Sequence, residues 1–175
     1  MFDQLYAKKR KQQAKKVNVE KNFIQISYKK EEFDVLARSK ICDIKTAGYD
    51  VNFDFRVEHL YSLDGNLEIR DLNIIAKELL VDPIIQNYKI NTSFKSKEYI
   101  NFYIADVWLK KGVTDSVGET IEKSIKSLGI NKEIKVKTGI RYLIEKKKDI
   151  KEIREIIEKL FVNSIINELF FENIF

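Results

Sequence analysis

The most constraining feature of the sequence is an internal repeat, because one fold must then accommodate two similar units. Shifting the chain by 81 residues aligns residues 29–90 with residues 110–171 without a gap. Identical residues fall where helices and turns begin or end. They include Asp34/Asp115, Ile44/Ile125, Gly48/Gly129, Tyr61/Tyr142, Ile84/Ile165 and Ile85/Ile166. We therefore predict that one supersecondary unit occurs twice in this chain.

Each copy predicts the same order of elements at its start. A strand is expected at residues 23–28 and again at residues 103–109. Asp34 in the first copy and Asp115 in the second can then cap the first turn of a helix. A glycine of each copy follows where that helix must end in a left-handed conformation, which glycine adopts without a steric penalty.

The middle of each copy predicts a long strand with one buried face. Residues 53–63 and 134–144 place apolar residues at alternate positions, as in a strand that packs on one side. Runs of this length exceed an ordinary strand, so we expect a bend or bulge near Gly139, or two strand segments.

The end of each copy predicts a second helix and a short final strand. The helix is expected at residues 69–80 and 150–161, and the strand around Ile84 and Ile165. The resulting fold class is α+β, with antiparallel sheets that carry helices on one face. Because a unit of about 70 residues is marginal alone, we expect the two units to pack together with pseudo-twofold symmetry.

The charge is distributed unevenly along the chain. The net charge is +5, and residues 1–16 hold six cations and one anion, which accounts for all of it. We therefore predict a basic arm at residues 1–18, a first unit at 19–91 and a second unit at 99–175. The arm could contact phosphate groups, but the balanced remainder makes nucleic acid an unlikely main partner.

The composition excludes several kinds of active site. One cysteine cannot form an internal disulfide. One histidine and one cysteine also supply neither an ordinary set of zinc ligands nor the cluster from which a histidine-based triad is built. Gly112 and Gly118 are six apart and are followed by Glu119, whereas a phosphate-binding loop has glycines five apart followed by lysine. His59 and Cys42 fit packing positions. We expect no catalytic residue, no metal site and no cofactor in this chain.

The sequence also predicts where the protein resides. No apolar run approaches the ~20 residues that span a bilayer, and the basic start lacks the apolar segment of a signal peptide. With one cysteine the composition fits a reducing compartment. We expect a cytoplasmic protein without a membrane partner.

One segment has features beyond those of an ordinary connection. Residues 110–120 join a strand end to a helix N-terminus, and they place Lys110 and Lys111 beside amide groups that can receive an anion or carboxylate. Gly118 lies inside the helix, at a cost of about 1 kcal/mol relative to alanine. Two interpretations stay open: a tight turn with a close backbone contact, or a docking or ligand surface.

Three segments of the second copy resemble the PurS family, the small subunit of phosphoribosylformylglycinamidine (FGAM) synthase. They read KKGVTDSVGETIEKSIKSLGI, VKTGIRYLI and KLFVNSIINELFFENI. Lys111 and Ser164 stand where the family has proline. Lys137 and Ile140 stand where it has arginine and lysine, and Arg141 can compensate for Ile140. The first copy retains LLVDPIIQNY at residues 79–88 but has no glycine to match Gly112 or Gly118. A tandem pair of such units resembles the N-terminal domain of the large, fused form of the synthase.

The resemblance implies an accessory role in purine biosynthesis. Such complexes use ATP and glutamine to form a carbon–nitrogen bond, and the PurS-like part bridges a PurL-type synthetase and a PurQ-type glutaminase during ammonia transfer. ATP and Mg²⁺ would bind the synthetase. The residues that we expect to contact the partners are Lys110, Lys111, Gly112, Asp115, Gly118, Lys137, Gly139 and Arg141.

Other interpretations remain open at this point. Paired ferredoxin-like units could form a regulatory module that binds a metabolite between the copies. The basic arm could serve a nucleic-acid-binding module, with affinity that falls steeply as salt rises. The chain could also be a stand-alone subunit or the N-terminal domain of a longer synthase.

Overall fold

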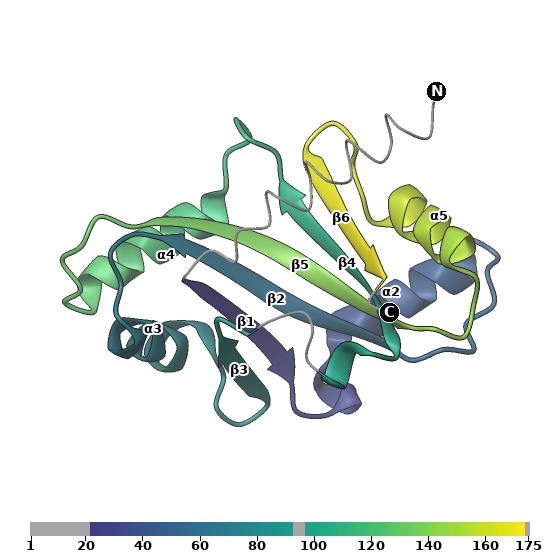
Figure 1. Cartoon of the computed structure of the whole chain (residues 1–175), viewed down its shortest axis with the longest axis horizontal. Coiled ribbons are helices and arrows are strands. Elements are labelled where there is room, and N and C mark those ends of the chain that lie inside the picture. Colours follow the sequence, from purple (N-terminus) through teal and green to yellow (C-terminus); the bar gives the residue numbers. More distant parts are fainter. Residues whose placement is uncertain (1–21, 93–96, 174–175) are drawn as a thin grey trace.

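The computed structural model of the protein describes residues 22–92 and 97–173, so the predicted basic arm lies outside the described residues. Its strands form one sheet in the order β3-β1-β2-β5-β4-β6, with every neighbouring pair antiparallel (Figure 1). The strands are β1 (Phe23–Tyr28), β2 (Phe55–Asp64), β3 (Gln86–Ile90), β4 (Phe102–Leu109), β5 (Lys135–Glu145) and β6 (Asn167–Asn173).

Four α-helices accompany the sheet in the described part of the chain. They are α2 (Val35–Thr46), α3 (Ile69–Ile75), α4 (Ser116–Ser127) and α5 (Ile150–Leu160). A π-helical turn, η2 (Ala76–Leu80), continues α3, and the short 3₁₀ turns are η1 (Glu31–Phe33) and η3 (Lys97–Tyr99). The α+β prediction is confirmed, but the two expected sheets are one continuous sheet.

The register of the sheet repeats with the same 81-residue shift that aligns the sequence. We call residues 22–92 the first half and residues 97–173 the second half. Each ladder of the first half has a counterpart of the same register in the second. The counterpart pairs are Phe23–Ser62 with Ile104–Leu143, and Ile24–Ile90 with Ala105–Phe171. In the central ladder His59 lies opposite Ile140, its own counterpart in the alignment.

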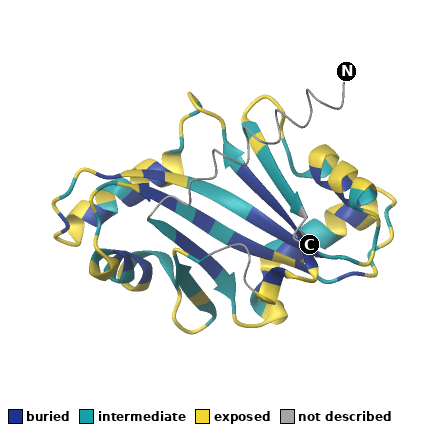
Figure 2. Ribbon diagram, in the orientation of Figure 1, coloured by how far each residue is buried: buried dark blue, intermediate teal, exposed yellow. Residues whose placement is uncertain are grey.

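Two apolar cores lie between the helices and one face of the sheet, and each draws residues from both halves. In one core, Ile44 of α2 is fully buried together with Tyr103 of β4 and Ile156 of α5. In the other, Ile75 of α3 is buried together with Ile125 of α4. Buried residues follow the long central strands, whereas the outer turns are exposed (Figure 2). The helices of one half therefore complete the core of the other.

The predicted helix caps are present and also fasten each helix to the sheet. Asp34 accepts hydrogen bonds from the amides of Ala37 (2.8 Å) and Val57 (3.0 Å). Asp115 accepts the equivalent bonds from the amides of Gly118 (2.8 Å) and Thr138 (2.6 Å). Gly48 and Gly129 adopt left-handed conformations after the helices, with φ of 88° and 83°, as predicted.

Two predictions about the strands are wrong. The β2–β5 ladder runs without interruption from Phe55–Ile144 to Asp64–Lys135, so there is no bulge near Gly139. The final strands begin two residues later than expected, which leaves Ile84 and Ile165 in the preceding turns. These turns satisfy their backbone amides with Asp82 or Asn163 side chains instead of with a neighbouring strand.

We predict that Asp115→Ala lowers the free energy of unfolding by about 1–3 kcal/mol, because one carboxylate satisfies both a helix amide and a strand amide. Urea unfolding followed by circular dichroism measures the change. Asp50→Ala, at an exposed loop position, serves as the control and should change the free energy by less than about 0.5 kcal/mol. Equal effects of the two substitutions would contradict this role of Asp115.

Candidate functional site

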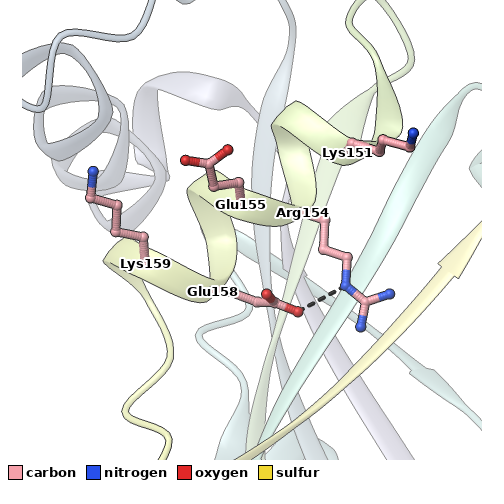
Figure 3. Close-up of a pocket in the computed structure, with 5 residues that line it drawn as sticks. All are labelled: Lys151, Arg154, Glu155, Glu158 and Lys159. Atoms are coloured by element: carbon pink, nitrogen blue, oxygen red, sulfur yellow. Dashed lines mark hydrogen bonds and ion pairs between the residues drawn. The ribbon is translucent and has the colours of Figure 1, made fainter.

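The surface of α5 carries a hollow. Five charged side chains line it, all from this one helix: Lys151, Arg154, Glu155, Glu158 and Lys159 (Figure 3). Arg154 donates a hydrogen bond to Glu158 at 2.8 Å, which is an ordinary i,i+4 pair on a solvated helix face. Because no second element forms an opposing wall, the hollow gives no enclosed site.

The loop between β4 and α4 carries the first group of predicted docking residues. Lys110, Lys111 and Gly112 are exposed at the end of β4, and Gly112 has a φ of 93° that favours glycine. The backbone amide of Lys110 donates to the carbonyl of Ile166 at 2.8 Å, and its ammonium group donates to the carbonyl of Ser164. The loop is thereby fastened to the turn that precedes β6.

Asp115 at the end of this loop and Gly118 in the first turn of α4 have structural explanations. Asp115 is engaged by the two amides described above and by the Thr138 hydroxyl at 3.0 Å. A Cβ atom on Gly118 would lie 2.5 Å from the carbonyl oxygen of Val136, so glycine permits the close approach of α4 to β5. The tight-turn interpretation therefore accounts for these two residues.

The predicted residues on β5 lie apart from the loop, on the face of the sheet opposite the helices. Lys137 is exposed there. A Cβ atom on Gly139 would lie 2.7 Å from the indole ring of Trp108, so this glycine makes room for the tryptophan on the neighbouring strand. Arg141 is only 1 % exposed. The eight residues thus form two groups, one at the β4–α4 loop and the start of α4, and the other on β5.

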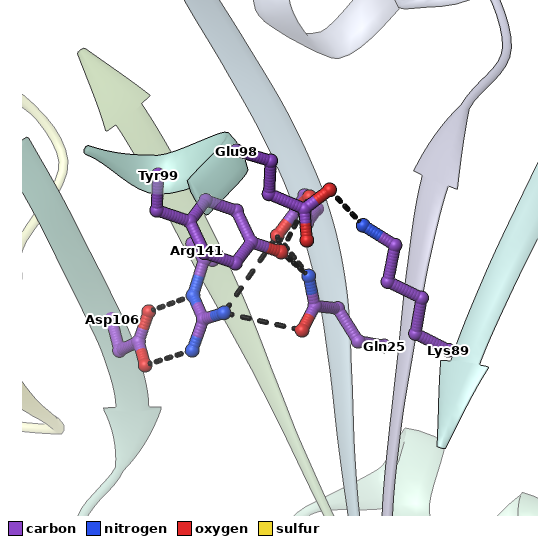
Figure 4. A network of polar contacts seen from close by, with 7 residues as sticks. Gln25, Lys89, Glu98, Tyr99, Asp106 and Arg141 are labelled. Carbon is purple, nitrogen blue, oxygen red and sulfur yellow. Dashed lines mark hydrogen bonds and ion pairs between the residues drawn. The ribbon is translucent and has the colours of Figure 1, made fainter. Parts of the chain in front are cut away.

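Arg141 belongs to a buried polar network at the centre of this opposite face (Figure 4). Its guanidinium group donates two hydrogen bonds to Asp106 on β4, at 2.7 and 2.8 Å. It also donates to the Gln25 side-chain oxygen at 3.2 Å, and the Gln25 amide donates to Glu58 at 2.6 Å. Tyr99 of η3 contacts both Gln25 and Glu58 through its hydroxyl group. The network therefore joins the two halves, with Gln25 and Glu58 from the first and Tyr99, Asp106 and Arg141 from the second.

The electrostatics of the network centre on Glu58. Burial raises the pKa of Glu58 from 4.5 to about 7, and the opposing positive charges of Arg141 and Lys89 do not cancel this effect. Burial alone would lower the pKa of Arg141, but hydrogen bonds and charge from Asp106 raise it above its ordinary value. Lys89 pairs with Glu98. With Glu58 protonated, the charges of the described network balance.

Sequence reasoning identified Arg141 but missed its partners Gln25, Glu58, Tyr99 and Asp106. A signal was present, because Gln25 and Asp106 interrupt strands that are otherwise rich in apolar residues. The interruption indicates a second, partly polar face. The partner choice requires the register, which places Arg141 between Glu58 on β2 and Asp106 on β4.

The one histidine and the one cysteine of the sequence occupy positions that favour packing or simple exposure. His59 is half-buried on the helix-bearing face, and burial lowers its pKa. Cys42 is exposed on α2 as a free thiol. Within residues 22–92 and 97–173 no group of three histidine, cysteine or acidic residues could hold a metal ion.

The comparison with protein families adds a specific finding. Residues 103–173 match the family described as PurS: phosphoribosylformylglycinamidine (FGAM) synthase. The matched segment runs from β4 to the end of β6 and includes the β4–α4 loop. No curated protein matches the sequence. In the described part of the chain, each helix is too short or too polar to cross a membrane.

We predict that Glu58→Gln makes stability less dependent on pH. The folded protein holds the Glu58 proton up to pH about 7 and the unfolded chain only to about 4.5, so the wild type loses stability as pH rises between these values. Melting temperatures should therefore favour the variant progressively from pH 5 to pH 8.

The matched control for this measurement is Glu32→Gln, which alters an exposed carboxylate paired with Lys30 at 3.3 Å. Its difference from the wild type should stay nearly constant over the same range. A constant difference for Glu58→Gln, or one that shrinks as pH rises, would contradict the assignment of a raised pKa to Glu58.

Proposed function

We propose that the chain is a tandem pair of PurS-like units in which the first half is a diverged copy of the second. The shared register of the ladders supports this proposal, as does the exchange of core residues between halves. The central pair His59–Ile140 is where the pseudo-twofold axis would pass.

Equivalent hydrogen bonds in the loops provide further support. Lys29 donates to the carbonyl of Pro83 at 2.6 Å, as Lys110 does to the carbonyl of Ser164, 81 residues later in each case. The backbone amide of Lys29 donates to Ile85 at 2.9 Å, as that of Lys110 does to Ile166. A chance similarity between two short sequences would not reproduce contacts between distant segments at the same 81-residue offset.

The proposed function is that of a non-catalytic subunit or domain of FGAM synthase in purine biosynthesis. The PurS match over the second half carries this proposal. The chain would bridge a synthetase and a glutaminase and support the transfer of ammonia between them. ATP, Mg²⁺, glutamine and the nucleotide substrate would bind the partners, and the complex would act in the cytoplasm.

Within this proposal the exposed residues make the partner contacts. Lys110, Lys111 and Gly112 lie on the surface of the β4–α4 loop, and Lys137 is exposed on the face of the sheet opposite the helices. The other predicted residues would act indirectly. Asp115 and Gly118 fix the start of α4, Gly139 seats Trp108, and Arg141 holds the network, so that the loop and the face keep their shapes.

A reconstitution assay tests the proposal. The chain is combined with the matched synthetase and glutaminase subunits, and glutamine-dependent turnover is measured. Omission of the chain should lower turnover at least about tenfold, and Lys111→Glu should raise the chain concentration needed for half-maximal turnover by about fivefold or more.

Lys123→Glu, on the exposed side of α4, is the matched control and should leave that concentration within about twofold of the wild type. Turnover that is the same with and without the chain would refute the proposed function. Equal effects of Lys111→Glu and Lys123→Glu would refute the assigned contact.

A further inference from the structure

Two turns at opposite edges of the sheet expose an isoleucine almost completely. The Ile84 turn (residues 82–86) precedes β3 and the Ile165 turn (residues 163–167) precedes β6, and these two strands form the edges (Figures 1 and 2). Ile84 is 79 % exposed and Ile165 is 80 % exposed, the highest values among the large apolar residues described. The two residues are counterparts at the 81-residue shift.

Both turns are held by the same three hydrogen bonds. In the Ile165 turn the Ile165 amide donates to the Asn163 side chain at 3.0 Å, and the Asn163 amide donates to the Asn167 side chain at 3.0 Å. The Asn167 amide closes the turn on the Asn163 carbonyl at 2.7 Å. The Ile84 turn has the equivalent bonds at 2.8, 2.9 and 2.8 Å.

This rigidity makes the exposed isoleucine suited to binding. A single exposed apolar residue is common and needs no explanation. Here, however, the neighbouring residue changes from Pro83 to Ser164 while the isoleucine is identical in both turns. A β-branched side chain on a fixed turn loses little conformational entropy when a partner covers it, so it can insert into an apolar pocket with a small ordering cost.

The charges around the two turns differ although the backbones match. Beside the Ile84 turn, Lys29 and Lys30 are followed directly by Glu31 and Glu32, and Lys30 pairs with Glu32 at 3.3 Å. Beside the Ile165 turn, Lys110 and Lys111 are followed by the uncharged residues 112–114. Asp82 adds a third anion within the Ile84 turn, so its surroundings carry a net charge of −1. Asn163 replaces that carboxylate in the Ile165 turn, where Lys110 and Lys111 outnumber the one adjacent anion, Glu168, and leave a net charge of +1.

We propose that the Ile165 turn, together with Lys110 and Lys111, docks into an apolar pocket bordered by carboxylates on a partner protein. The Ile84 turn offers the same shape without the positive border, so it does not bind that pocket. This inference rests on the proposed function, in which the partner is the synthetase or the glutaminase subunit. Ile165 anchors that contact, and the charges of Lys110 and Lys111 make it specific to the Ile165 turn.

Isothermal titration of the full-length chain against each purified subunit tests the proposal. Ile165→Ser should weaken binding to one subunit at least about tenfold, whereas Ile84→Ser, the matched control, should change that affinity by less than about twofold. Raising the salt from about 0.05 M to about 0.5 M should weaken binding by the wild type, because the lysine contacts are screened.

The possible failures are distinguishable. If the wild type binds a subunit and Ile165→Ser binds equally well, or if Ile84→Ser loses as much affinity, the docking role is wrong and the proposed function stands. If the wild type binds neither subunit, both proposals fail. If light scattering shows that Ile165→Ser dissociates a dimer of the chain, the turn contacts a second copy and the proposal is also overturned. Because both side chains are exposed, neither substitution should change the melting temperature. Unchanged melting temperatures then exclude unfolding as the cause of lost binding.

Discussion

The pairing of β2 with β5 is the interaction on which the rest of the structure depends. The antiparallel ladder extends without a break from the residue pair Phe55–Ile144 to the pair Asp64–Lys135. It makes a single sheet from the two halves. The helices then pack across this seam, so that α2 shares a core with α5, and α3 with α4. Each half alone would expose the surface that the other covers, which is how two marginal units give one body.

The buried polar network specifies how the halves meet rather than adding greatly to stability. Buried ion pairs roughly offset their desolvation cost, but loss of one partner is destabilising. Arg141 lies between Glu58 and Asp106 in the register, with Gln25 and Tyr99 completing its surroundings. A slip of one residue would turn Arg141 toward the apolar cores. The network therefore makes any other register of the strands unfavourable, and so fixes the relative positions of the loops that these strands carry.

Much of the fold could be predicted from the sequence, because alternation, caps and terminal glycines are local signals. Asp34 and Asp115 cap their helices as expected, whereas the bulge near Gly139 is absent because that glycine serves a contact with Trp108 on another strand. Ile84 and Ile165 resemble strand residues by hydropathy, yet side chains of Asp82 and Asn163 hold them in turns. The partners of Arg141 and the single sheet depended on pairings between distant strands, which no local pattern encodes.

The central claim is that the two halves form one cooperative body across the β2–β5 seam. Native-state hydrogen exchange on the full chain tests it most directly, because it resolves the opening free energy of each amide. The account predicts that the slowest amides of β2 and β5 exchange with one common free energy, equal to that of global unfolding. If the amides of one half exchanged through a lower-energy opening while the other half stayed protected, the halves would be independent units and the account would be wrong.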